Sequence, residues 1–247
     1  MQGLTLIGSG WHPTLFRAEV KALTGPIEVM HPRVLYIPLT ESTLPRLSRA
    51  ALLDDVLSLS ARYWVYSETS QEDLSRTIAE WAQLNLPEGS FAVRARKLGT
   101  GISGFSSSEI ESEVGALVMR DSNPVDLHEP ENEISVVIAG PDDGPTHRDD
   151  IGQNSPIVVW GLRQPGWQRD SYAGRAPTDR PFFQPVSLDP RQAKLMISLA
   201  HRRLSETKTV VDPFCGTGGI AIEAALQGIE VLASDLDSRM VEGTLEN

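Results

Sequence analysis

Residues 209–219 read Thr-Val-Val-Asp-Pro-Phe-Cys-Gly-Thr-Gly-Gly, and they decide the fold of the C-terminal part of the chain. An apolar run ends at Asp212, a turn of small residues runs from Gly216 to Gly219, and an apolar helical stretch follows. A strand, a tight glycine turn and a helix in this order let a nucleotide-like ligand lie against bare backbone. The pattern therefore predicts the start of an open α/β unit with a ligand site at the turn.

A second acidic residue completes this pattern. Asp235 follows the next expected strand, at a spacing that suits a carboxylate on ribose hydroxyls. The turn lacks both the Gly-x-Gly-x-x-Gly order of dinucleotide sites and the lysine of phosphate loops. Asp212 instead places an anion beside the turn, which suits a ligand with a cationic amino-acid end. These features favour S-adenosylmethionine over a nicotinamide cofactor, although a glycine turn can also serve only close packing.

The region ahead of this unit mixes short strands and helices. Apolar runs alternate with amphipathic stretches of helical period, which predicts a small α+β domain or two such domains in series. The expected strands are Leu4–Ile7, Val34–Leu39, Tyr63–Tyr66, Phe91–Arg96, Ile134–Ala139 and Ile157–Gly161, and the expected helices are Leu15–Leu23, Leu44–Leu57, Glu72–Leu84 and Ser107–Met119.

Composition narrows the classes of protein and of partner. The net charge of −11 argues against a general nucleic-acid coat, because phosphate binding requires a high density of cations. Residues 161–208 nevertheless carry nine basic and four acidic side chains, so a local contact with RNA is compatible with the sequence. A single cysteine and five scattered histidines predict neither a disulfide nor a metal site. No run of membrane-spanning length and no signal peptide is present, and we expect a cytoplasmic protein.

The glycine turn resembles a known motif. Asp212-Pro213-Phe214-Cys215-Gly216-Thr217-Gly218-Gly219 looks like the first motif of class I methyltransferases that act on exocyclic amines of nucleic-acid bases. Phe183-Gln184-Pro185-Val186-Ser187-Leu188 resembles the segment that precedes this motif in the same group, with Val186 where a glycine is usual.

The upstream region resembles the THUMP RNA-binding domain. Together with the segment Leu6–Gly25, the order of motifs is similar to that of archaeal tRNA guanine-N2 methyltransferases of the guanine-10 type. The motifs that carry this resemblance are Phe91–Lys97, Ser108–Glu111 with Gly115, and Val125–Leu127 with Pro130.

The resemblance implies an organisation and a cofactor site. It implies a ferredoxin-like domain over residues 1–60, a THUMP domain over 61–163, a linker over 164–181 and the start of a Rossmann-like methyltransferase domain over 182–247. The methionine half of S-adenosylmethionine would lie on the glycine turn, the ribose on the acidic residue and the adenine on the leucine after it. The implied cofactor residues are Asp212, Pro213, Gly216, Thr217, Gly218, Asp235, Leu236, Ser187 and Leu188.

The same resemblance implies that the THUMP domain binds the acceptor end of tRNA. Arg94, Arg96 and Lys97 lie on one expected strand and lead into a flexible loop rich in small residues, so we expect them to contact phosphates. The alternative is a solvated strand face that pairs with nearby acidic residues such as Glu109 or Glu111.

The catalytic element of this family is an Asn/Asp-Pro-Pro-Tyr loop, and residues 1–247 contain no such sequence. We therefore expect an N-terminal part of a tRNA guanine-N2 methyltransferase that carries RNA binding and part of the cofactor site but lacks catalytic residues. Three alternatives stay open: a THUMP-containing enzyme for ribosomal RNA, a non-catalytic RNA-binding module, and a nucleotide-dependent oxidoreductase.

Overall fold

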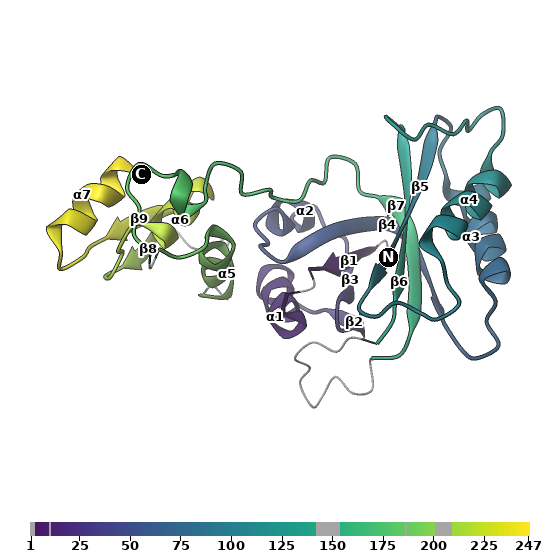
Figure 1. Cartoon of the computed structure of the whole chain (residues 1–247), viewed down its shortest axis with the longest axis horizontal. Coiled ribbons are helices and arrows are strands. Elements are labelled where there is room, and N and C mark those ends of the chain that lie inside the picture. The colour runs from purple at the N-terminus through teal and green to yellow at the C-terminus, as the bar shows by residue number, and fades with distance from the viewer. Residues whose placement is uncertain (1–2, 10, 142–153, 186, 201–208) are drawn as a thin grey trace. The chain divides into compact units, whose positions relative to one another are not determined.

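The computed structural model describes residues 3–9, 11–141, 154–185, 187–200 and 209–247 (Figure 1). The chain forms two compact units, each assembled from segments that are separated in sequence. The first unit holds residues 1–17, 27–39 and 54–168, and the second holds residues 18–26, 40–53 and 169–247.

A seven-stranded mixed sheet forms the framework of the first unit. The strand order is β2-β3-β1-β4-β7-β6-β5. Strands β1 and β2 both pair antiparallel with β3, β7 pairs antiparallel with β4 and β6, and β5 runs parallel to β6. The strands are β1 (Gly3–Gly8), β2 (Glu28–His31), β3 (Val34–Pro38), β4 (Leu53–Trp64), β5 (Phe91–Leu98), β6 (Asn132–Ala139) and β7 (Ile157–Arg163).

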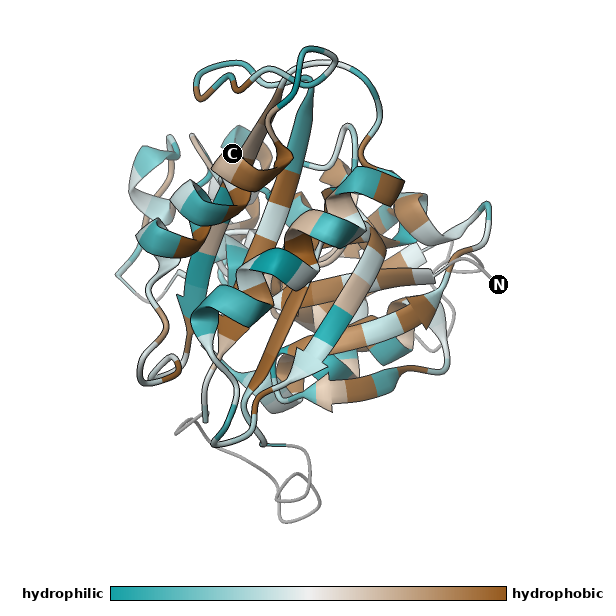
Figure 2. Cartoon of the chain, turned by 90° about the vertical axis from the view of Figure 1, so that its right-hand side faces the viewer, coloured by the Kyte–Doolittle hydropathy of each residue, from teal (hydrophilic) through white to brown (hydrophobic). Residues whose placement is uncertain are grey.

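Two helices cover one face of this sheet, α3 (Gln71–Asn85) and α4 (Ser107–Val118) (Figure 1). A serine immediately precedes each helix, and its side chain accepts a hydrogen bond from a backbone amide of the first turn. These serines are Ser70 for α3 and Ser106 for α4. Their apolar residues pack on β5, β6 and β7 in a core that contains the buried Trp160. Figure 2 looks onto these helices and shows the hydrophobic strands that lie beneath them.

A smaller core lies on the opposite face of the sheet. Its members alternate with those of the helix-covered core along each strand, as the period of two requires, so that Val137 and Val159 belong to it while Val136 and Val158 face the helices. Leu98 at the end of β5 also belongs to this second core.

The second unit contains two parallel strands and the helices around them. β8 (Thr209–Asp212) pairs with β9 (Glu230–Ala233), and α6 (Gly219–Leu226) connects them. This strand–turn–helix–strand order is the α/β start that the sequence predicts. The remaining elements are α2 (Thr43–Leu47), a short 3₁₀ turn η2 (Pro177–Asp179), α5 (Pro190–Ala200) and α7 (Ser238–Glu246), while α1 (Pro13–Thr24) contributes residues to both units.

The structure corrects one expected helix. The helical pattern over Leu44–Leu57 yields only α2, and residues from Leu53 onward belong to β4. Because β4 lies between β1 and β7 in the sheet, pairing with two neighbouring strands outweighs the local apolar period. The expected border between residues 60 and 61 also falls inside β4, so both expected N-terminal domains share one sheet, and the four-part division stays a prediction.

No helix among the described residues combines the length and the apolar character that crossing a lipid bilayer requires.

Candidate functional site

Two glycines in the left-handed region shape the turn after β8. Gly216 has φ +54° and Gly218 has φ +79°, a conformation that residues with a side chain rarely adopt. Gly218 is the residue that precedes α6, and the space where a Cβ of Gly216 would project is open. The turn therefore presents bare backbone beside open space, as a ligand cradle requires.

Asp235 closes the turn from the end of β9. Its Oδ2 accepts a hydrogen bond from the Gly216 amide at 2.9 Å, and its Oδ1 accepts one from the Asp237 amide at 3.0 Å. These backbone donors, Asp237 first and then Gly216, lower the pKa of the Asp235 carboxyl below its usual range. The structure thus brings together the two halves of the pattern that the sequence separates by about 20 residues.

The segment ahead of α5 lies against the same turn. The hydroxyls of Ser187 and Thr217 are 2.9 Å apart, and Thr217 is buried. A Cβ on Gly219 would lie 3.3 Å from the Cβ of Leu188, so Leu188 packs close to the first residue of α6. Ser187 and Leu188 therefore lie against the glycine turn, and their role in cofactor binding stays a prediction.

The remaining predicted residues lie at or just after the carboxyl ends of β8 and β9. The Asp212 carboxylate accepts a hydrogen bond from the Phe214 amide at 3.3 Å. The Pro213 carbonyl accepts one from the Ser234 hydroxyl at 3.4 Å, which ties the end of β8 to the end of β9. Leu236 is 97% exposed directly after Asp235, so it offers an apolar surface to a planar group.

Two further residues, Thr244 of α7 and Asn247, which follows α7, donate hydrogen bonds to the backbone of the turn. Neither residue was predicted from the sequence. The Thr244 hydroxyl donates to the Gly216 carbonyl at 2.9 Å, and the Asn247 amide donates to the Thr217 carbonyl at 3.0 Å. Asn247 also bonds the backbone of Phe182, which lies beside Gly243. No motif spacing indicates these contacts, since they depend on how α7 packs.

These features fit a nucleoside with an amino-acid end. The bare backbone at Gly216 provides room and amide groups, the Asp235 carboxylate is an acceptor for hydroxyls, and Leu236 is a surface for a planar base. Cys215 is buried, and its Sγ lies 3.8 Å from the Thr244 hydroxyl, as expected of a packing residue. Among the described residues, no group of three or more His, Cys, Asp or Glu side chains has the geometry to hold a metal ion.

An ionic network ties residues 170–180 to the helices of the second unit. Asp170 pairs with Arg175 and, at 2.9 Å, with Lys194 of α5, and these hydrogen bonds lower the pKa of Asp170 to about 2 despite its partial burial. Arg175 also lies 3.1 Å from Glu223 of α6 and stacks on the Tyr172 ring. Burial raises the pKa of the Glu223 carboxyl, which is almost fully buried.

The three predicted RNA-binding residues do not share one face of the sheet. Because successive side chains of a strand point to opposite faces, Arg96 lies on the face without α3 and α4 and Lys97 lies on the other. Arg94, on the edge strand β5, lines a cavity together with residues of α4. Arg94 is exposed and donates to the Leu127 carbonyl. Arg96 pairs at 3.8 Å with both Asp54 and Asp55, so this arginine takes part in a network within the sheet.

Lys97 presents its charge at the start of a glycine-rich loop. Its side chain is exposed, and its stem lies over Gly101, where a Cβ would be 2.8 Å from the lysine Cδ. Gly99 and Gly101 both adopt the left-handed conformation. Of the basic segment 161–208, residues 201–208 lie outside the described part of the chain.

Comparison with known families identifies two regions of the chain. Residues 68–140 match the THUMP domain family, and residues 177–247 match the family described as RMKL-like, methyltransferase domain. The second match includes the glycine turn, Asp235 and α7, which are the parts of the candidate site. The chain thus combines a THUMP domain with an RMKL-like methyltransferase region.

Two curated relatives that this chain resembles have the same name. The tRNA (guanine(10)-N2)-dimethyltransferase of Methanothermobacter thermautotrophicus is 32% identical over 203 residues, which are 82% of this chain and 52% of the relative. The protein of the same name from Methanocaldococcus jannaschii is 34% identical over 163 residues, which are 64% of this chain and 41% of the relative. The chain therefore spans about half the length of the curated relatives that it matches.

Solved structures show the same fold. TrmN from Thermus thermophilus superposes with a TM-score of 0.58 and 25% identity over 100% of this chain and 69% of that chain. SMU.472, whose structure was solved in complex with SAH, superposes with a TM-score of 0.53 and 15% identity over 100% of this chain and 72% of that chain.

Proposed function

We propose that this chain, a THUMP domain joined to an RMKL-like methyltransferase region, acts in the transfer of a methyl group from S-adenosylmethionine to the exocyclic N2 amine of guanine 10 in tRNA. The names of the curated relatives support the substrate and the reaction. The methyltransferase match favours this cofactor over a nicotinamide cofactor. The observation that carries the proposal is the hydrogen bond from the Gly216 amide to the Asp235 carboxylate, which assembles one site from two strand ends.

Each residue of the site has a definite task in this proposal. When bound, S-adenosylmethionine supplies the activated methyl group. The backbone from Gly216 to Gly218 and the Asp212 carboxylate hold its methionine half, with Pro213 fixing the direction in which the chain leaves β8. The Asp235 carboxylate accepts the ribose hydroxyls, and Leu236 covers the adenine.

Ser187 and Leu188 complete the cofactor end of the site. Ser187 holds the Thr217 hydroxyl at 2.9 Å, so it fixes the side of the turn that faces the cofactor carboxylate. Leu188 packs at the first residue of α6 and keeps water from that side. The second unit therefore binds and orients the methyl donor.

Substitution of Asp235 tests whether this carboxylate binds the cofactor. Asp235→Asn removes the charge but keeps the size, and we expect at least tenfold weaker binding of S-adenosylmethionine and of S-adenosylhomocysteine by calorimetry. Asp237→Asn is the matched control, because the Asp237 side chain caps α7 and pairs with the exposed Arg239, and asparagine caps a helix equally well. Equal affinity in both variants and the wild-type protein would contradict the proposal.

The first unit positions tRNA in this proposal. Arg94, Arg96 and Lys97 contact phosphates. The exposed Lys97 is the main cation, because Arg96 also forms ion pairs with Asp54 and Asp55. Lys97→Gln should weaken tRNA binding and reduce the slope of log affinity against log salt by about 1. Arg76→Gln on α3 is the matched control, since Arg76 is an exposed cation outside the proposed surface.

A further inference from the structure

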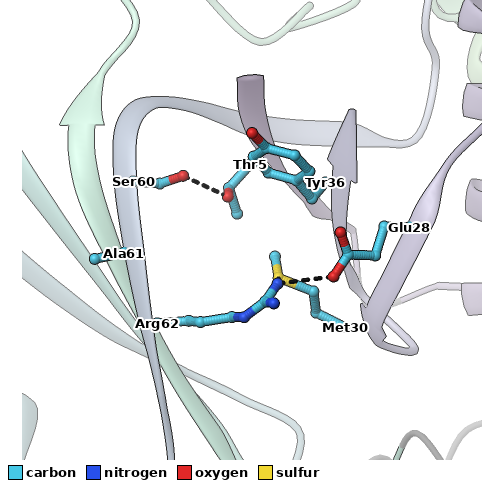
Figure 3. Close-up of a pocket in the computed structure, with 7 residues that line it drawn as sticks. All are labelled: Thr5, Glu28, Met30, Tyr36, Ser60, Ala61 and Arg62. Carbon is cyan, nitrogen blue, oxygen red and sulfur yellow. Dashed lines mark hydrogen bonds and ion pairs between the residues drawn. The ribbon is translucent and has the colours of Figure 1, made fainter. Parts of the chain in front are cut away.

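A cavity lies in the first unit, outside both regions that match known families. Its volume is about 320 Å³, and it opens beside the irregular part of β4 (Figure 3). Seven residues from four strands line it: Thr5, Glu28, Met30, Tyr36, Ser60, Ala61 and Arg62.

Polar side chains form a row across the four strands at this cavity. Tyr36 of β3 lies opposite Thr5 of β1 on one side and opposite Glu28 of β2 on the other. The Thr5 hydroxyl bonds the Ser60 hydroxyl of β4 at 2.7 Å. A carboxylate and three hydroxyls therefore line one face of the sheet, each able to accept a hydrogen bond.

The cavity contains one charge of each sign. Arg62 Nη1 lies 2.9 Å from Glu28 Oε1 and 2.8 Å from the Met30 sulfur, and the Arg62 and Glu28 side chains are 43% and 54% exposed. A phosphate bound to Arg62 would also meet the Glu28 carboxylate. The pair therefore favours a neutral ligand that offers both donors and acceptors.

The Tyr36 ring forms a flat wall of the cavity. A Cβ on Gly3 would lie 2.2 Å from the ring, so the ring rests on bare backbone and its remaining surface lines the cavity. On the opposite wall, β4 shifts register between Ser58 and Ala61, and Leu59 adopts φ +48°, which a non-glycine residue rarely does. In Figure 3 the Ser60 side chain of β4 points toward Thr5, and the Arg62 side chain points toward Met30 and Glu28.

We propose that this cavity holds one unpaired nucleoside of the RNA substrate, an inference that rests on the proposed function. The base stacks on the Tyr36 ring, its polar edge meets the Arg62–Glu28 pair, and the Thr5 and Ser60 hydroxyls bond the remaining polar atoms. The volume is at the lower end of the range for small-molecule sites, which suits a group of nucleoside size. An aromatic face with nearby donors and acceptors is how proteins read unstacked RNA bases.

Affinity for bulk tRNA tests the proposal with two independent changes. Tyr36→Leu removes the stacking surface, and the double variant Glu28→Gln, Arg62→Gln replaces the charged pair at exposed positions. We expect each to weaken tRNA binding on the order of tenfold. The salt slope should stay unchanged, because the contact is with a base and releases no counterions, whereas Lys97→Gln reduces it.

The control is a second exposed ion pair in the same unit. Glu72→Gln, Arg76→Gln removes a pair of identical chemistry on α3 and should leave tRNA affinity unchanged. Thermal unfolding of each variant identifies any loss of fold. In addition, tRNA that carries 5-bromouridine and 5-bromocytidine should photocrosslink to the peptide that contains Met30 and Tyr36.

Several outcomes would overturn the proposal. Folded Tyr36 and Glu28/Arg62 variants that bind tRNA as the wild-type protein does would overturn this inference alone. Calorimetric binding of free adenosine, cytidine, guanosine or uridine without any effect of the variants on tRNA would assign the cavity to a free nucleoside instead. Wild-type protein that does not retain tRNA would overturn the proposed function as well.

Discussion

Gly218 both adopts a left-handed backbone conformation and packs against Thr244 of α7. A Cβ at this position would lie 2.7 Å from Thr244 Cγ2, and the backbone has φ +79°. Gly216 has φ +54° but open space around it. We therefore expect Gly218→Ala to lower the free energy of unfolding of the second unit by about 2 kcal/mol and Gly216→Ala by about 1 kcal/mol.

Hydrogen exchange of the β8 and α6 amides measures these two losses, since both elements flank the turn. Equal losses in the two variants would show that Thr244 does not confine Gly218, and the account of α7 as a support for the turn would be wrong.

Glu19 makes the stability of the second unit depend on pH. The side chain is fully buried and accepts hydrogen bonds from the Ala51 and Leu52 amides at 2.7 and 2.9 Å. Burial raises the pKa of its carboxyl to about 7 from an ordinary 4.5. The unfolded chain then releases this proton at lower pH than the folded protein, so the free energy of unfolding falls as pH rises from about 4.5 to 7, by about 3 kcal/mol.

Glu19→Gln removes this titration, and urea unfolding at several pH values across that window, followed by circular dichroism, compares it with the wild-type protein. A decline of equal size in the variant would assign the pH dependence to other groups.

The stretch from Asp170 to Arg180 acts as an element of the second unit, although the sequence predicts only a linker there. Arg175→Met should cost about 3 to 5 kcal/mol, because it leaves the buried Glu223 carboxylate without its partner. Arg239→Met is the matched control, since the Arg239–Asp237 pair is exposed and we expect its loss to change stability far less. Protease sensitivity of α5 and α6 reports the difference. Similar costs for the two variants would contradict the role of this stretch.

The local sequence pattern predicts some secondary-structure elements correctly and others wrongly. The three serines before Glu109 and the apolar spacing after it predict α4, because a cap and a helical period are both local signals. The pattern over Leu44–Leu57 fails, because membership of β4 in the sheet depends on strands that lie far away in sequence. The irregularity at Leu59 has no local signal either, since neither glycine nor proline marks it.

Within the whole molecule, the sequence predicts the backbone part of the candidate site but not its surroundings. Gly216, Gly218 and Asp235 follow from spacing, since a strand, a turn and a second strand fix their relation. Thr244 and Asn247 approach the turn only once α7 is packed, so no spacing identifies them. Paired charges such as Arg96 with Asp55 depend likewise on the order of strands in the sheet.

The proposed reaction joins both units in one activity on tRNA. The most direct test incubates unmodified tRNA with S-adenosylmethionine and the full gene product that contains these residues, followed by nucleoside mass spectrometry and mapping of the methylated position. We expect N2-methylguanosine or N2,N2-dimethylguanosine at position 10, and we expect this product to be lost in Asp235→Asn. Methylation of another base or position, or none by folded protein that binds tRNA, would contradict it.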